Sequence, residues 1–117
     1  MKAVHAVVGP REAGPGERLE MLERAHDILT QAGVDGVDRI DIPGRGAGEE
    51  GEGGMLRGEI ERLVPALQSG SLFGGRRGVL VIDAHQFQAA ETAIVAAMAT
   101  GLDPDSVVLG FVAEGAL

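Results

Sequence analysis

The sequence predicts an α/β fold in which a parallel sheet of about four strands is flanked by helices in three layers. Two short runs, residues 79–82 and 107–112, hold no charged side chain, which is typical of strands buried on both faces of a parallel sheet. Stretches with apolar residues at three- and four-residue steps alternate with the apolar runs along the chain. This alternation begins and ends with a strand, and it predicts a single sheet covered by helices on both faces.

Four strands are expected. Residues 3–8 are short, apolar and rich in Val, as in a buried strand. Residues 38–42 alternate polar and apolar side chains, as in a half-exposed strand, and Pro43 ends them. Residues 78–83 and 107–112 have the continuous apolar character of buried strands.

Three helices are expected between these strands. Residues 18–32, 56–67 and 87–98 each place apolar side chains on one helical face. Pro65 falls inside the second of these helices, where it removes one backbone donor and is expected to interrupt and kink the helix. Residues 44–54 contain six glycines and three glutamates, and we interpret them as a flexible surface loop.

Composition sets limits on function. The 117 residues are expected to form one domain, residues 1–117, and the net charge of −8 argues against direct nucleic-acid binding by this domain. There is no cysteine, so disulfides and thiolate metal sites are excluded. No signal-peptide pattern is visible at the start of the sequence, and no apolar run approaches the length of a membrane helix, so no membrane partner and a cytoplasmic location are expected.

The loop after the first strand has the spacing of a phosphate-binding loop but lacks its chemistry. Gly9 and Gly14 are five residues apart, as in a P-loop, but Pro15 stands where the lysine belongs and Gly16 where the hydroxyl belongs. The positive charge that would contact the β- and γ-phosphates is therefore missing, and so is one magnesium ligand. The other interpretation is a plain Gly/Pro turn that opens a helix. Under both interpretations, this is at most a degenerate nucleotide site.

Asp83 ends the third strand, at the position of a Walker-B acid. Ala84 follows it, where active ATPases often carry a catalytic glutamate. We favour the interpretation that Asp83 caps the next helix by accepting backbone N–H bonds. A phosphoacceptor aspartate of the receiver type is a third reading, although the first strand is not followed by the pair of acids that would bind magnesium.

The histidines predict no metal or catalytic site. His5 lies in the first strand, His26 in the first helix and His85 close to Asp83. Their spacing is not that of a metal site. The pair of His85 and Asp83 has no nucleophile nearby in sequence, so we interpret all three histidines as structural or solvent-exposed.

The segment before the third strand is a candidate protein anchor. Ser71, Leu72 and Phe73 precede two glycines and the pair Arg76 and Arg77, a composition typical of a surface junction. An exposed Leu-Phe step suits an interface because a few buried apolar side chains carry most interface energy. The arginines could steer an acidic partner. The alternative is that Leu72 and Phe73 fold back to cover the sheet.

The chain resembles the N-terminal domain of the delta subunit of the bacterial DNA polymerase III clamp loader. The resemblance rests on a Walker-A position without lysine, a Walker-B position without glutamate, and the run ALQSGSLFGGRRGVLVIDA leading into a buried strand. It extends over residues 4–112 and is sharpest over residues 66–83. The glycine- and glutamate-rich residues 44–54 depart from the family pattern.

The resemblance implies a non-catalytic role in DNA replication. In that family this domain binds the ring-shaped sliding clamp, the beta subunit, and favours the open ring. Carried over to this sequence, the clamp-binding residues are Ser71, Leu72 and Phe73. Neither ATP hydrolysis nor a cofactor is expected, and contacts with other clamp-loader subunits would use further domains. The alternative function is a small nucleotide-binding or phosphoacceptor domain that uses Asp83.

The resemblance also implies an AAA+-like core whose strands lie in the order first, fourth, third, second. A fifth strand would flank the first and lie beyond Leu117. The first strand, residues 4–8, is then expected to be an exposed edge through which the isolated domain dimerises.

Overall fold

The computed structural model describes residues 2–44, 57–68 and 75–115 of the chain. Strands and helices alternate within these ranges, as expected from the sequence. The elements are β1 (Val4–Gly9), α1 (Pro15–Gln31), β2 (Val34–Asp41), α2 (Gly58–Gln68), β3 (Arg76–Ile82), the short helix η2 (Ala84–Gln86), α3 (Ala89–Thr100) and β4 (Val107–Glu114).

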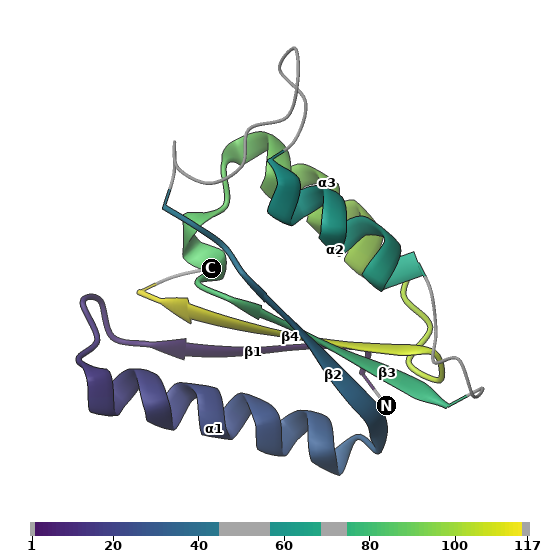
Figure 1. The fold of residues 1–117 in the computed structure, drawn as a ribbon, viewed down its shortest axis with the longest axis horizontal. Helices are drawn as coiled ribbons and strands as arrows, with labels where there is room; N and C mark the ends of the chain where they lie inside the picture. Colours follow the sequence, from purple (N-terminus) through teal and green to yellow (C-terminus); the bar gives the residue numbers. More distant parts are fainter. Residues whose placement is uncertain (1, 45–56, 69–74, 116–117) are drawn as a thin grey trace.

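The four strands form one parallel sheet in the order β1-β4-β3-β2. Helix α1 lies on one face of this sheet, and α2 and α3 lie on the other (Figure 1). The predicted α/β class, parallel sheet and strand order are therefore confirmed. The predicted edge position of the first strand is confirmed too, because β1 ends the order of the sheet.

Each face of the sheet packs its own apolar core. Val79 and Val81 of β3 belong to the cluster under α2 and α3, while Leu80 belongs to the cluster under α1. Successive side chains of a strand point to opposite faces, and helices cover both faces of this sheet, so all three side chains are fully buried. This burial explains why the sequence of β3 is apolar at every position from Val79 to Ile82.

Most element boundaries shift by one or two residues from the prediction, and three features differ more. Strand β2 begins at Val34 rather than at residue 38, since a register shift between Val34 and Gly36 breaks the alternation of polar and apolar residues there. Helix α1 begins at Pro15, and its first turn carries no apolar period. The expected interruption at Pro65 is wrong in one respect, because α2 continues through this residue to Gln68.

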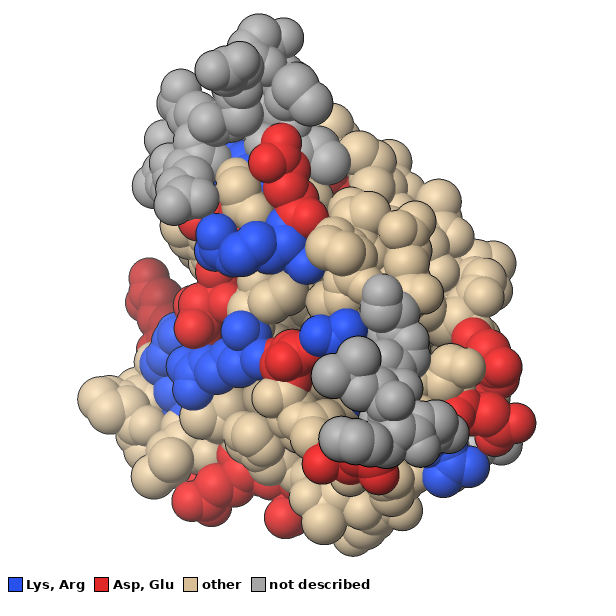
Figure 2. Space-filling view, turned by 45° about the vertical axis from the view of Figure 1, so that its right-hand side comes forward, with Lys and Arg blue, Asp and Glu red and all other residues tan. Residues whose placement is uncertain are grey.

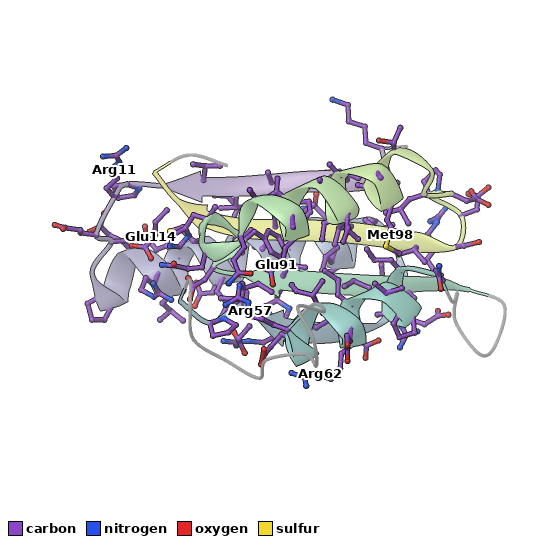
Figure 3. All side chains as sticks on the ribbon, turned by 90° about the horizontal axis from the view of Figure 1, so that it is seen from above. Arg11, Arg57, Arg62, Glu91, Met98 and Glu114 are labelled. Carbon is purple, nitrogen blue, oxygen red and sulfur yellow. The ribbon has the colours of Figure 1, made fainter. Side chains whose placement is uncertain are left out.

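A buried ion pair joins the two helices on one face. Arg57, 4% exposed, precedes α2, and Glu91, 1% exposed, lies in the first turn of α3. Arg57 donates from Nε to Oε2 of Glu91 (2.8 Å) and from Nη2 to Oε1 (2.6 Å). The rest of its guanidinium donates to three backbone carbonyls, which belong to Pro43, Gly44 and Gln86. Figure 3 shows the pair between the two helices.

Burial by itself would raise the pKa of the Glu91 carboxyl group. The hydrogen bonds from Arg57 and from the backbone N–H of Gln88, together with the charge of Arg57, outweigh burial and hold this pKa below its ordinary value. The Arg57 hydrogen bonds raise the pKa of the guanidinium in turn. Both groups are therefore charged at neutral pH, and the pair ties the end of β2 to the beginnings of α2 and α3.

Candidate functional site

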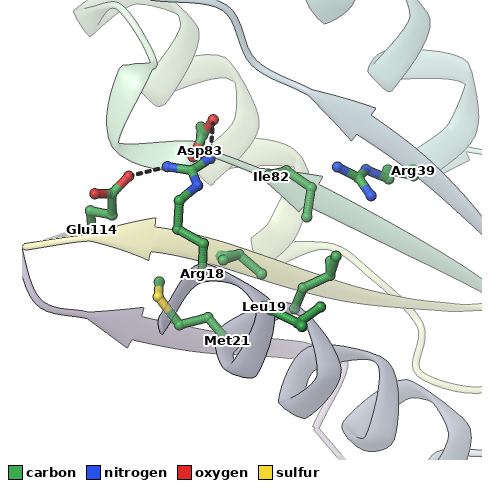
Figure 4. Close-up of a pocket in the computed structure, with 9 residues that line it drawn as sticks. Arg18, Leu19, Met21, Arg39, Ile82, Asp83 and Glu114 are labelled. Atoms are coloured by element: carbon green, nitrogen blue, oxygen red, sulfur yellow. Dashed lines mark hydrogen bonds and ion pairs between the residues drawn. The ribbon is translucent and has the colours of Figure 1, made fainter. Parts of the chain in front are cut away.

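A small pocket lies at the carboxyl ends of the central strands, where ligands bind in open parallel sheets. Its volume is about 240 Å³, which is below the range typical of sites that enclose whole cofactors or drug-sized ligands. Figure 4 shows Arg18 and Leu19 of α1 over the ends of β3 and β4. The lining residues are Arg18, Leu19, Met21, Leu22, Arg39, Ile82, Asp83, Val112 and Glu114.

Arg18 is the centre of the charged part of this pocket. Its Nη2 donates to both carboxylate oxygens of Asp83, at 3.0 Å and 3.1 Å, and its Nη1 donates to Oε2 of Glu114. The hydrogen bond and charge of Asp83 are the largest causes that raise the pKa of Arg18, and Glu114 adds to them. Two carboxylates from the ends of β3 and β4 thus share one guanidinium from α1, whose side chain is 44% exposed.

The interpretation of Asp83 as a helix cap is wrong. Its side chain makes no capping bond to η2. Instead it accepts hydrogen bonds from Arg18, which lies 65 residues earlier in the chain. Asp83 has a positive φ of 62°, a left-handed conformation that Asp tolerates better than most residues. This conformation turns the chain sharply out of β3 at the pocket.

Carboxylates of the chain itself accept hydrogen bonds from backbone N–H groups in the loop between Gly9 and the start of α1. The N–H of Ala13 donates to Oε1 of Glu114 (2.8 Å), and the N–H of Gly14 donates to Oε1 of Glu17 (3.2 Å). Backbone N–H groups at a helix N-terminus are the groups that bind phosphate in nucleotide sites. Here Glu114 takes that place, and it is also bound by Arg18.

Two of the three glycines in this loop, Gly9 and Gly14, occupy positions that suit glycine. A Cβ atom on Gly9 would lie 2.3 Å from Sδ of Met21, so the residue leaves room for the side chain of Met21. Gly14 is the N-cap of α1 and Pro15 its first residue, while Gly16 faces open space. These contacts support the interpretation of a Gly/Pro turn that opens a helix.

His85 lies beside the same carboxylates but in a structural role. Its Nδ1 accepts a hydrogen bond from the backbone N–H of Glu114 (3.0 Å), and its Nε2 lies 3.7 Å from Oε2 of that residue. Because Nδ1 accepts, a neutral His85 carries its proton on Nε2. The ligand atoms of Asp83, His85 and Glu114 lie within 4.8 Å of one another, but Nδ1 of His85 is bound by the N–H of Glu114, and Arg18 is paired with both acids.

Sequence reasoning found Asp83 but missed Arg18 and Glu114. The signal for Glu114 was its place two residues after the last apolar residue predicted for the fourth strand, at the edge where ligands bind. The signal for Arg18 was weaker, since an arginine in the first turn of a helix has no unusual feature. His5, half-buried on β1, and His26, exposed on α1, lie away from the pocket lining.

The predicted clamp-binding residues Ser71, Leu72 and Phe73 lie outside the described residues. The described residues continue from Gly75, next to the amino end of β3 and therefore at the end of the sheet opposite the pocket.

The flank that follows these residues is held firmly. Arg76 donates to the backbone oxygens of Ala32 (2.8 Å) and Pro104 (3.1 Å), and Arg77 donates to the carboxylate of Asp38. Both guanidinium groups are thus bound within the chain, which weakens the interpretation that they steer a partner. Figure 2 likewise shows Lys and Arg side chains lying among Asp and Glu on the face in view.

No known family model and no curated protein matches the chain. None of the helices in the described ranges is both long and apolar enough to cross a membrane.

Proposed function

We propose that the chain is a non-catalytic, AAA+-like domain of the clamp-loader delta type, which binds a DNA polymerase sliding clamp and helps to open it during DNA replication. Leu72 and Phe73, preceded by Ser71, are the anchor of this interaction. The proposal rests on the resemblance over residues 66–83 and on a parallel sheet in the order that this resemblance implies.

The observation that carries the non-catalytic part of the proposal is the position of Glu114. Its carboxylate is bound to the N–H of Ala13 and to Arg18, where a nucleotide site would hold a phosphate. A bound phosphate would have to displace this carboxylate and then lie beside the charge of Asp83. The small pocket and the absence of a P-loop lysine at Pro15 point the same way.

The alternative function, a nucleotide-binding or phosphoacceptor domain that uses Asp83, has weaker support. Arg18 holds both oxygens of the Asp83 carboxylate, at 3.0 Å and 3.1 Å. A phosphoacceptor needs one of these oxygens free to attack phosphorus, and a magnesium site needs them free to bind the ion.

The proposal is tested by titrating the chain with a bacterial sliding clamp in a calorimeter, and separately with ATP and magnesium. Truncating Phe73 to Ala removes a side chain whose full burial is worth about 1.5–3 kcal/mol, so the clamp affinity should fall roughly ten- to one-hundred-fold. The matched control is Leu19→Ala, which truncates a large apolar side chain that is 56% exposed on α1. Tight binding of ATP that is lost in Asp83→Ala, with no binding to the clamp, would favour the alternative function instead.

A further inference from the structure

One edge of the sheet has free backbone hydrogen-bonding groups. The N–H of Leu109 donates to the carbonyl of Ala3 (2.7 Å), and the N–H of Gly115 donates to the carbonyl of Gly9 (2.9 Å). In a parallel ladder, alternate residues of a strand bond to the same neighbour, so the odd-numbered residues of β1 face β4. The residues between them direct their N–H and C=O groups away from β4, where no strand of the described chain lies. These outward-facing residues are Val4, Ala6 and Val8.

The side chains of β1 include none of the charged residues or prolines that keep edge strands from pairing with other chains. Strand β1 holds no charged residue and no proline, and Val8 is 48% exposed. The opposite edge, β2, carries Asp35, Asp38, Arg39 and Asp41, which is how natural proteins prevent edge strands from pairing with other chains. The difference between the two edges indicates that β1 is open to pairing and β2 is not.

Helix α3 has an unusual surface on the same side of the molecule. It lies over β4 and beside β1 (Figure 3), and Val4 packs against the same cluster as Val95 and Met98 of this helix. A surface helix normally exposes charged residues, but the only charged residue of α3 is the buried Glu91. Its exposed residues are Ala89, Ala90, Thr92, Ala93, Ala96, Ala97 and Thr100.

We propose that the β1 edge is a self-pairing surface on which a second copy of this chain adds its own β1 antiparallel to the first. The outward-facing residues set the register, in which Ala6 lies opposite Ala6 of the second copy and Val4 lies opposite Val8. Each of these pairs joins residues whose N–H and C=O groups both point outward, so the ladder is complete on both sides.

The symmetry of this pairing suits the rest of the surface. A two-fold axis at Ala6, perpendicular to the sheet, keeps the two α3 helices on one face and on either side of the axis. Their small exposed side chains leave room for the helices to approach closely. The chain carries a net charge of −8, so two copies repel each other electrostatically. Strand β1 holds no acidic residue, so two copies can meet along this edge without bringing like charges together.

The proposal is independent of clamp binding and is tested on the chain alone by sedimentation at increasing concentration. The wild type should move from 12.1 kDa toward twice that mass as its concentration rises. Ala6→Lys and Ala6→Glu each place two like charges opposite each other at the axis, so each variant alone should remain a monomer. An equimolar mixture of the two variants should recover the dimer, because opposite charges then face each other.

Val37→Lys is the matched control, since Val37 is an exposed apolar residue on β2, the edge that the proposal leaves unpaired. It should dimerise like the wild type. Circular dichroism of each variant separates loss of pairing from loss of fold. A wild type that stays monomeric at all concentrations would overturn the proposal. A dimer that survives both Ala6 variants, or a mixture that stays monomeric, would overturn the register.

Discussion

Removal of the Glu91 carboxylate should destabilise the fold far more than removal of a carboxylate from an exposed pair. Glu91→Ala removes the carboxylate that binds Nε and Nη2 of Arg57, at a site where Arg57 is only 4% exposed. Breaking a buried pair from one side costs about 3–5 kcal/mol. A domain of 117 residues has a total stability of about 6–17 kcal/mol, so this one change removes a large share of it.

The assay is urea unfolding followed by circular dichroism. With a urea m-value of about 2 kcal/mol/M, the expected loss lowers the midpoint by about 2 M. Asp41→Ala is the matched control, because Asp41 pairs with Arg39 on the surface, where the two side chains are 59% and 49% exposed. A pair of this kind is worth about 0–1 kcal/mol. If Glu91→Ala were as mild as Asp41→Ala, the reasoning about this pair would be refuted.

The double variant Arg57→Met/Glu91→Leu distinguishes the charge from the hydrogen bonds. Replacing both partners of a buried pair by apolar residues is often neutral, because no charge is left without its partner. Here the carbonyls of Pro43, Gly44 and Gln86 would still lose the hydrogen bonds that Arg57 donates. Each such carbonyl that stays buried costs about 1–3 kcal/mol, so the double variant should regain only part of the lost stability.

Three further outcomes are expected. The pKa of Glu91 is lowered on folding, so its contribution to stability is present above the unfolded pKa of about 4.3 and is lost as pH falls through the folded pKa. Glu91→Gln should therefore flatten the acid side of a plot of unfolding free energy against pH. Glu114→Ala frees the N–H of Ala13, so inorganic phosphate should raise the melting temperature of this variant but not that of the wild type. A Cβ on Gly78 would lie 3.1 Å from the carbonyl oxygen of Gly36, so Gly78→Ala should cost about 1–3 kcal/mol in urea unfolding, whereas Gly36→Ala faces open space and should cost little.

Much of the fold could be predicted because its signals are local. The apolar runs of β3 and β4 follow directly from burial on both faces, and the alternation with helices then requires parallel strands. The start of β2 could not be found in this way, because the register shift between Val34 and Gly36 breaks the alternation of polar and apolar residues there.

The candidate site was only partly predictable, because its contacts join distant parts of the chain. The place of Asp83 at the end of a strand was visible in the sequence, but its partner Arg18 is chosen by how α1 packs across the sheet. The same holds for Arg57 and Glu91. Their sequence neighbours resemble those of any surface charge, and only the packing of α2 beside α3 buries them.

The most direct test of the proposed function is the dissociation constant of the chain for a sliding clamp, measured by calorimetry for the wild type and for Phe73→Ala. The wild type should bind saturably with no added nucleotide, and the dissociation constant of the variant should be at least roughly ten-fold higher. No binding by the wild type, or equal dissociation constants for the two proteins, would contradict it.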